Sequence, residues 1–371
     1  MAVQIDTTRA TLDPLANVAP PPLLPQPVVG PGTAPVRIGV IGYGYWGPNV
    51  VRNFVEVPGA QVTTVSDRRG PRLAQVQARY PSITVTTDCN AVFADPSVDA
   101  VAIITPVSTH FDLAMEALSA RKHVLVTKPM TATSEQALRL IEKADEVGRV
   151  LMVDHTFLYT GAVRKVKELV QSGALGRLYY FDSVRVNLGL FQHDVNVLWD
   201  LAVHDLSIMD YVIGEMPVAV AASGVAHVPG QPVNMAYLTC FFKDNVLAHL
   251  HVNWLAPVKV RRTLIGGDRR MIVYDDLEPS EKVKVYDKGV IVGNASTEQV
   301  YDSLVGYRTG DMWAPHVSVT EGLQTEAQHF IDCIVKGQRP LTDGHAGLRL
   351  LRILEAATKS LSQRGQPVEI D

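Results

Sequence analysis

The chain has few cysteines, no basic cluster and no long apolar run, and each absence excludes a class of function. Its three cysteines, Cys89, Cys240 and Cys333, lie far apart and are odd in number. We therefore expect reduced, buried thiols without metal-ligand spacing. The net charge is −4 over 371 residues, so no basic surface is offered to nucleic acid or to an anionic membrane. No apolar run approaches the roughly 18 residues that span a bilayer.

The first residues also lack the basic stretch followed by an apolar stretch that marks a secretory signal. We therefore expect a cytoplasmic protein with no membrane partner. Hydrophobic residues make up 47% of the chain and charged residues 19%, which is typical of a globular protein with a sizeable core. The length allows two domains.

Residues 1–35 differ from the rest of the chain because they hold eight of its 23 prolines. Such a segment cannot build a core and favours extended, polyproline-like conformations. Two interpretations stay open for this proline-rich N-terminal arm: a loose leader, or a segment that lies on a neighbouring subunit.

A glycine-rich turn follows the first predicted strand. The apolar run Val36–Ile41 leads into Gly42-x-Gly44-x-x-Gly47. In such a motif the first glycine permits a sharp turn, the second lets the backbone approach a pyrophosphate, and the third lets the next helix pack on the strand. The helix N-terminus adds free N–H donors and the positive end of its dipole. A second strand ends at Asp67, twenty residues beyond Gly47, where a carboxylate meets the adenosine ribose. The pattern predicts a dinucleotide site.

Asp67 also bears on which dinucleotide binds. Its carboxylate repels a 2′-phosphate, whereas the arginines that follow, Arg68 and Arg69, can hold that phosphate or stack on adenine. Because the carboxylate comes first, we predict NAD, with NADP as the less favoured alternative. The predicted cofactor-binding residues are Gly42, Tyr43, Gly44, Tyr45, Trp46, Gly47, Asp67, Arg68, Thr105, Pro106, His110, Thr127 and Lys128.

The order of predicted elements changes near residue 158. Residues 36–158 alternate strands and helices, as in a doubly wound parallel sheet. Consecutive strands between 218 and 286 instead favour an antiparallel sheet. We predict an α/β Rossmann domain over 36–158 and an α+β domain over 159–371 with a large, mainly antiparallel open sheet. The uncovered face of that sheet predicts a homo-oligomer built through the sheet.

Lys128 ends the fifth predicted strand of the parallel sheet and is followed by Pro129. At the carboxyl end of such a strand it is expected over the cofactor, where desolvation makes a lysine a proton donor or a substrate clamp. The alternative is a solvated surface lysine. His110 fits a residue at a helix start near the cofactor, and His155 fits a packed core histidine as well as a substrate ligand.

A predicted helix over Val197–Val212 carries Asp200 and His204, four residues apart. At that spacing the two side chains share a helix face, and a carboxylate beside an imidazole fixes its tautomer and stabilises the imidazolium. A histidine with a pKa near neutrality can take the proton of a hydroxyl while hydride leaves the same carbon. The alternative is an ordinary pair on a solvated face, and Asp205 is expected to cap or pair. No further ligand has metal spacing, so no metal is expected.

Together these motifs resemble the glucose–fructose oxidoreductase / inositol dehydrogenase / MocA (Gfo/Idh/MocA) family of sugar dehydrogenases, over about residues 36–371. The resemblance implies that Lys128 and His204 align substrate and transfer a proton and that Asp200 supports His204. It also implies a tetramer or dimer whose subunits join through the open sheet. The motifs are Gly42-x-Gly44-x-x-Gly47, Thr105-Pro106-x-x-x-His110, Lys128-Pro129 and Asp200-x-x-x-His204.

Within the family, residues 155–159, 185–189 and 196–207 look like the branch of nucleotide-sugar 3-dehydrogenases that acts on UDP-N-acetylglucosamine derivatives. Two departures stand out. Thr127 replaces the glutamate of the family's Glu-Lys-Pro motif. Leu158 and Thr160-Gly161 replace an Arg and an Asn-Pro.

We therefore predict NAD-dependent oxidation of a secondary ring hydroxyl, at C3 of a pyranose carried on a nucleotide or another group. His204 takes the proton and Lys128 stabilises the reacting oxygen, or the two roles are exchanged. The predicted substrate-binding residues are His155, Tyr159, Asn187 and Asn196. The alternatives are a free sugar, polyol or inositol dehydrogenase, an NAD-binding sensor without turnover, and a redox-neutral use of bound NAD.

Overall fold

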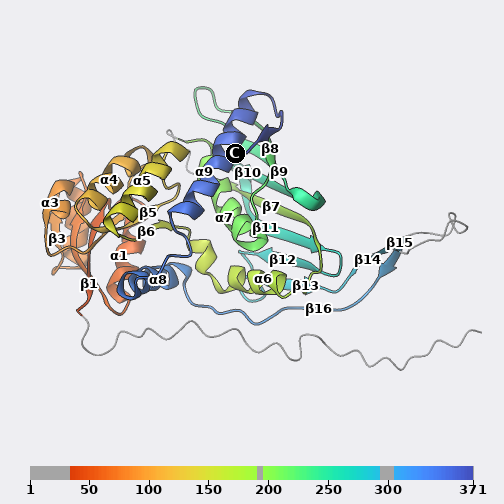
Figure 1. Cartoon of the computed structure of the whole chain (residues 1–371), viewed down its shortest axis with the longest axis horizontal. Coiled ribbons are helices and arrows are strands. Elements are labelled where there is room, and N and C mark those ends of the chain that lie inside the picture. The colour runs from red at the N-terminus through yellow and green to blue at the C-terminus, as the bar shows by residue number, and fades with distance from the viewer. Residues whose placement is uncertain (1–33, 190–194, 293–304, 371) are drawn as a thin grey trace, which may run out of the picture.

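The computed structural model describes residues 34–189, 195–292 and 305–370. All but the last two residues of the predicted N-terminal arm lie outside these ranges. Figure 1 shows a parallel sheet with its helices on one side of the molecule and a larger sheet on the other, with helix α9 running between them.

The first sheet has six parallel strands in the order β3-β2-β1-β4-β5-β6. This is the strand order of a dinucleotide-binding sheet. All strands are parallel, and the order in which the chain adds them changes side between β1 and β4. Strand β4 is buried along its whole length and β1 nearly so, because helices cover both faces of the sheet. The strands are β1 (Val36–Ile41), β2 (Ala60–Ser66), β3 (Thr84–Thr86), β4 (Ala100–Ile103), β5 (His123–Thr127) and β6 (Leu151–Asp154). The helices are α1 (Gly47–Glu56), α2 (Gly70–Arg79), α3 (Cys89–Ala94), α4 (His110–Ser119) and α5 (Ser134–Val147).

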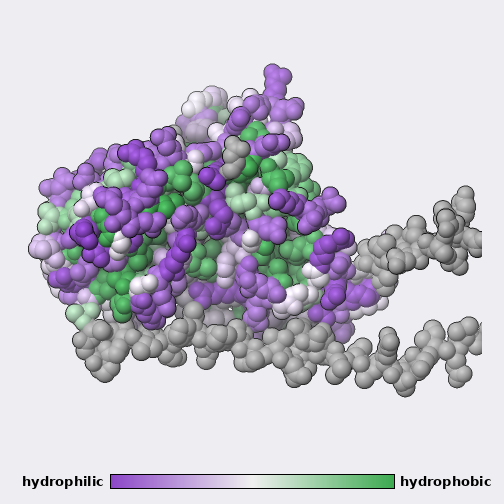
Figure 2. Space-filling model, viewed as in Figure 1, coloured by the Kyte–Doolittle hydropathy of each residue, from purple (hydrophilic) through white to green (hydrophobic). Residues whose placement is uncertain are grey.

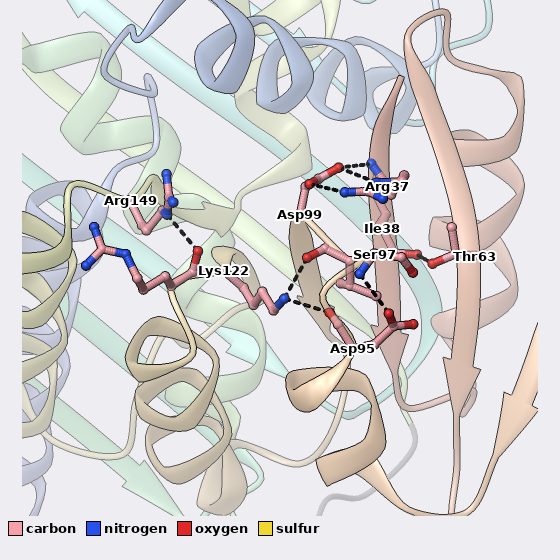
Figure 3. A network of polar contacts seen from close by, with 10 residues as sticks. Arg37, Ile38, Thr63, Asp95, Ser97, Asp99, Lys122 and Arg149 are labelled. Carbon is pink, nitrogen blue, oxygen red and sulfur yellow. Dashed lines mark hydrogen bonds and ion pairs between the residues drawn. The ribbon is translucent and has the colours of Figure 1, made fainter. Parts of the chain in front are cut away.

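A polar network fastens the amino ends of these strands (Figure 3). Arg37 at the start of β1 donates three hydrogen bonds of 2.9 Å to Asp99, which precedes β4. Lys122, just before β5, donates to the carbonyl oxygens of Asp95 at 2.7 Å and Val98 at 2.8 Å. The network therefore lies at the amino ends of the strands, whereas an open α/β sheet binds its ligands beyond the carboxyl ends.

The second sheet has nine strands in the order β16-β13-β12-β11-β7-β10-β9-β8-β17. Only the β7–β10 pair is parallel among the strand pairs of this sheet in the described residues. The strands are β7 (Leu178–Leu188), β8 (Ala219–Val225), β9 (Met235–Phe241), β10 (Leu247–Asn253), β11 (Leu255–Gly267), β12 (Met271–Asp275), β13 (Val283–Tyr286), β16 (Met312–Trp313) and β17 (Val368–Glu369). A separate two-stranded ladder pairs β14 (Gly289–Val292) with β15 (Val305–Arg308).

Helices cover one face of this sheet. They are α6 (Gly161–Gln171) and α7 (Val203–Ile213), preceded respectively by a 3₁₀ turn over Thr156–Tyr159 and a π turn over Leu198–Ala202. The space-filling view shows hydrophobic patches among hydrophilic side chains on both halves of the molecule (Figure 2). In the described residues no helix combines the length and the apolar character needed to cross a membrane.

The last two helices, α8 (Gly322–Lys336) and α9 (Gly344–Ser362), return to the first sheet. Phe330 of α8 packs edge-on against Phe54 of α1, with ring centroids 6.2 Å apart. Glu355 of α9 accepts hydrogen bonds from the N–H and hydroxyl of Ser134 at 2.7 and 2.6 Å. On the same helix, Ser360 accepts from the backbone N–H of Ala222 in β8 at 2.8 Å. Helix α9 thus contacts both sheets.

The predicted fold class is confirmed, an α/β Rossmann sheet followed by a mainly antiparallel one. The bounds of β1 are as predicted. The predicted helix over Val197–Val212 needs a correction, because its first part is a π turn and the α-helix begins at Val203.

Candidate active site

The glycine-rich turn fits a dinucleotide. Gly42 has φ of +97°, and a Cβ there would lie 2.3 Å from the carbonyl oxygen of Ile104. A Cβ on Gly47 would lie 2.8 Å from the carbonyl oxygen of Gly42. At Gly44 the nearest group to a Cβ is the Arg69 guanidinium, at 3.7 Å. The first and third glycines are thus required by packing inside the turn, whereas the second leaves space for a phosphate.

Asp67 lies beside this turn with a side chain 5% exposed. It accepts hydrogen bonds from the backbone N–H of Tyr43 at 2.7 Å and of Arg69 at 2.9 Å. Burial opposes ionisation, but these bonds and those from the Arg69 side chain outweigh it and lower the pKa of Asp67. Arg69 forms the ion pair at 3.0 Å, and Arg68 is exposed. The carboxylate is therefore negative where the ribose is expected.

The three aromatic residues of the turn have different environments. Tyr43 is buried in the core, and Tyr45 is 83% exposed. Trp46 donates a hydrogen bond of 2.8 Å from Nε1 to Asp154, which ends β6. Trp46 thus connects the glycine-rich turn to the carboxyl end of the edge strand β6.

His110 connects the ends of β4 and β5. Its ring nitrogens lie 2.8 Å from the carbonyl oxygens of Pro129 and of Thr105. The Thr127 hydroxyl lies 3.3 Å from the carbonyl oxygen of Ile103. His110 is buried, so it holds the two segments that carry Thr105, Pro106 and Lys128 in place.

Lys128 reaches across to the second half of the chain. Its Nζ donates to the backbone carbonyl of Asp200 at 2.7 Å and to the Asp200 carboxylate at 3.1 Å. The other carboxylate oxygen of Asp200 accepts from Trp254 Nε1 at 3.0 Å. Both ion-pair side chains are 21% exposed. The structure thus brings Lys128 and Asp200 together, one from each half.

The predicted pairing of Asp200 with His204 is wrong. Both oxygens of Asp200 are taken by Lys128 and Trp254, and His204 Nδ1 is buried without a hydrogen-bond partner among the described residues. The N–H of Val203 bonds to the carbonyl of Leu198, five residues back. The segment is therefore not a regular α-helix, and the groups that bond to Asp200, those of Lys128 and Trp254, come from distant parts of the chain. His204 instead packs edge-on against Phe157, with centroids 5.2 Å apart.

The predicted near-neutral pKa of His204 is also wrong. Burial lowers the pKa of His204 well below 6.5, and the charges of Lys128, Arg185 and Arg261 and the ring of His155 lower it further. His204 is therefore a neutral imidazole at physiological pH. A neutral imidazole can accept a proton, and the cations around it favour negative charge on a reacting oxygen.

A buried ion pair next to His204 is not evident from the sequence. Arg185 of β7 bonds to both carboxylate oxygens of Asp205, at 2.7 and 3.1 Å, and both side chains are 4% exposed. The Arg185 guanidinium also lies 4.5 Å from the centre of the Phe157 ring. The expected pairing role of Asp205 is confirmed, but its partner comes from a distant strand, which spacing along the chain does not reveal.

The four residues predicted to bind substrate have different environments in the structure. His155 is buried, neither ring nitrogen has a partner among the described residues, and burial lowers its pKa to about 4. Asn187 lies half-buried on β7, two residues after Arg185 and so on the same face of the sheet. Asn196 accepts from the N–H groups of Leu198 and Trp199 at 3.0 and 3.3 Å, which makes it a helix cap.

The predicted role of Tyr159 in substrate binding is wrong. Its side chain is buried, and its hydroxyl lies 3.0 Å from that of Thr342. Its ring packs at 5.5 Å from that of His329 on α8. Tyr159 is thus part of the core and its hydroxyl is taken, so it is not placed to hold a sugar.

Comparison with known proteins matches both halves of the chain. Residues 36–155 match the model of an oxidoreductase family with an NAD-binding Rossmann fold, and residues 163–273 match the GFO/IDH/MocA C-terminal domain. The chain belongs to the Gfo/Idh/MocA family. The resemblance inferred from the motifs is confirmed.

Individual relatives in the Gfo/Idh/MocA family act on different substrates. An uncharacterised oxidoreductase of Escherichia coli K12, YdgJ, is 31% identical over 67% of this chain and 73% of its own. UDP-N-acetylglucosamine 3-dehydrogenase of Acidithiobacillus ferrooxidans is 29% identical over 85% of this chain and 94% of its own. A solved structure of that enzyme superposes with a TM-score of 0.75 at 26% identity, covering 90% of this chain and 99% of its own. Myo-inositol 2-dehydrogenase of Thermotoga maritima is 26% identical over 89% of this chain and 97% of its own.

As a Gfo/Idh/MocA member, the protein is an NAD-dependent oxidoreductase of sugars or polyols. Three features fit hydride transfer to NAD: the open space at Gly44, the negative Asp67, and Lys128 near His204. Nucleotide-sugar and inositol dehydrogenases are similarly close to this chain.

Proposed function

We propose that the enzyme oxidises a secondary ring hydroxyl at C3 of a pyranose carried on a nucleotide or another conjugate. The observation that carries this proposal is the Lys128–Asp200 contact of 3.1 Å beside a neutral His204. It supplies a cation and a proton acceptor at one place, which alcohol oxidation requires. The similarity to UDP-N-acetylglucosamine 3-dehydrogenase supports the choice of sugar.

In this mechanism bound NAD supplies the acceptor for the hydride. Lys128 Nζ donates a hydrogen bond to the substrate oxygen and stabilises the negative charge that develops on it. The neutral His204 imidazole takes the hydroxyl proton, so the C–H and O–H bonds break and a ketone forms. Asp200 keeps Lys128 in position through its carboxylate and its backbone carbonyl.

A second candidate is a free polyol or inositol dehydrogenase. The match to myo-inositol 2-dehydrogenase over 350 residues favours it, because it covers as much of the chain as the nucleotide-sugar relative does. The two candidates use the same proton and hydride chemistry and differ only in what surrounds the reacting carbon.

The test is the rate of NADH formation, followed by absorbance, with UDP-N-acetylglucosamine, its uronic acid, free glucose, methyl glycosides and inositols. We expect the nucleotide sugar to give the highest kcat/KM and a 3-keto product. His204→Asn should lower kcat by about 10²-fold while NAD affinity stays unchanged, and His316→Asn, at an exposed position, should change neither. Preferred turnover of an inositol would establish the second candidate. NAD binding without oxidation of any compound would instead indicate a sensor.

A further inference from the structure

Two arginines lie opposite each other on neighbouring strands beside His204. In the register of β7 and β11, Arg261 pairs directly with Arg185, so both side chains lie on the same face of the sheet. Both guanidinium groups lie near the Phe157 ring, Arg185 at 4.5 Å and Arg261 at 5.7 Å from its centre. Phe157 in turn contacts His204. The arginine pair therefore borders the proposed reaction site.

The two arginines differ in burial and in the number of hydrogen bonds that they make to protein groups. Arg185 is buried and bonded to both oxygens of Asp205. Arg261 is 29% exposed and makes one bond, from Nη1 to Asp276 at 3.0 Å. The second oxygen of Asp276 accepts from the Tyr274 hydroxyl at 3.2 Å. Among the described residues Arg261 Nε and Nη2 have no hydrogen-bond partner, so they are available to a ligand.

Three cations lie near His204, each paired with one carboxylate: Lys128 with Asp200, Arg185 with Asp205 and Arg261 with Asp276. The charged groups with the largest effects on His204 are Lys128, Arg185 and Arg261, all of them cations. A guanidinium binds a carboxylate or a phosphate through charge-assisted hydrogen bonds, which are stronger than those to a neutral hydroxyl. A neutral polyol would leave the free edge of Arg261 without such a partner.

We propose that Arg261 binds an anionic group of the substrate, a carboxylate or a phosphate, and so selects an acidic sugar or a nucleotide sugar over a neutral polyol. This inference rests on the proposed oxidation of a sugar hydroxyl. It adds the chemical class of the group attached to that sugar and the residue that recognises it.

The experiment compares Arg261→Gln and Arg261→Lys with wild type and with Arg262→Gln. Arg262 is the next residue on β11, lies on the opposite face of the sheet and pairs with Asp275 at 2.8 Å. Rates of NADH formation are measured with UDP-N-acetylglucosamine, UDP-N-acetylglucosaminuronic acid, free glucuronate and myo-inositol. Arg261→Gln should lower kcat/KM for the preferred anionic compound at least about tenfold more than for myo-inositol, mainly through KM. Arg261→Lys should restore part of the loss, and Arg262→Gln should behave as wild type.

The panel separates the two sources of negative charge. A selective loss with free glucuronate identifies a carboxylate, and a selective loss with UDP-N-acetylglucosamine, which has no carboxylate, identifies a phosphate. Equal losses on charged and neutral compounds, or no loss on either, would overturn the proposal. In the double variant Arg261→Gln/Asp276→Asn, no unpaired carboxylate is left at position 276. Thermal unfolding of the single and double variants checks that both are folded.

Equilibrium binding keeps this inference separate from the proposed oxidation. The acidic compounds are titrated into the NAD-loaded wild type and Arg261→Gln proteins. Binding that weakens in the variant supports the role of Arg261 even where no compound is turned over. Absence of binding by every acidic compound to the wild type would refute it.

Discussion

At the scale of single residues, Lys128 and His204 are coupled through charge and not through Asp200. Asp200 holds Lys128 by its backbone and its side chain, and the positive charge of Lys128 is one of the causes that lower the pKa of His204. The sequence identifies all three residues from strand-end position and family motifs. It assigns Asp200 to the wrong partner, because spacing along one helix cannot reveal that Lys128 and Trp254, from distant segments, bond to its two carboxylate oxygens.

Replacing Lys128 should therefore raise the pKa of His204. Lys128→Met removes a cation that disfavours the imidazolium, so the pKa moves upward toward 6.5. An NMR titration of the histidine ring protons measures it, with His204→Asn to assign the signal. Lys143→Met serves as the control, because Lys143 pairs with Glu146 on the exposed face of α5. An unchanged His204 titration in Lys128→Met would mean that the two side chains do not share a site.

At the scale of elements, local signals explain which segments were predictable. Helix α5 has such signals at both ends, because Thr133 caps its start and Gly148 ends it in the left-handed conformation. The edge strands β16 and β17 have two residues each, too few for an alternating pattern. The Arg185–Asp205 pair and the core position of Tyr159 depend on contacts between distant elements. No periodicity along the chain encodes such contacts.

Helix α8 should make stability depend on pH through Glu326. This carboxyl is buried beneath the end of β6, where it accepts from the N–H of His155 and the hydroxyl of Thr156, both at 2.9 Å. Burial, and then the charge of Asp154, raise the pKa of Glu326 well above 4.5. Because the folded-state pKa is the higher one, the stabilisation is complete below about pH 4.5 and is lost as pH rises toward the folded-state value.

Glu326→Gln should remove that dependence, since an amide does not ionise. We expect the Tm of the variant to exceed that of wild type at pH 8 by a few degrees, and the difference to vanish near pH 4.5. Thermal unfolding across this range measures it. Parallel curves for the two proteins would show that Glu326 carries the same charge in the folded and unfolded states.

At the scale of the whole molecule, the second sheet has helices on one face and exposed aromatic residues on the other. Tyr237 of β9 is 39% exposed and stacks on His251 of β10, with ring centroids 4.5 Å apart. His249 lies next to them, 3.6 Å from Asp182 of β7. An exposed group of this kind supports the expected association of subunits through the sheet, which stays a prediction.

A charge on that face should disrupt such an oligomer. Tyr237→Asp places a carboxylate in the proposed contact, and we expect a shift from dimer or tetramer toward monomer in sedimentation velocity. Leu138→Asp is the matched control, because Leu138 is equally exposed, at 39%, but lies on α5 of the first sheet. A monomeric wild type, or the same shift in both variants, would rule out this face as the contact.

Helix α9 has a consequence for how the protein is made. It joins Ser134 to the second sheet through Glu355 and Ser360, yet it follows all but one of the strands of both sheets along the chain. On the ribosome, each sheet can form before the helix that joins them has emerged. When the segment up to residue 343 has emerged, the chain therefore carries two nearly finished halves without the helix that holds them together.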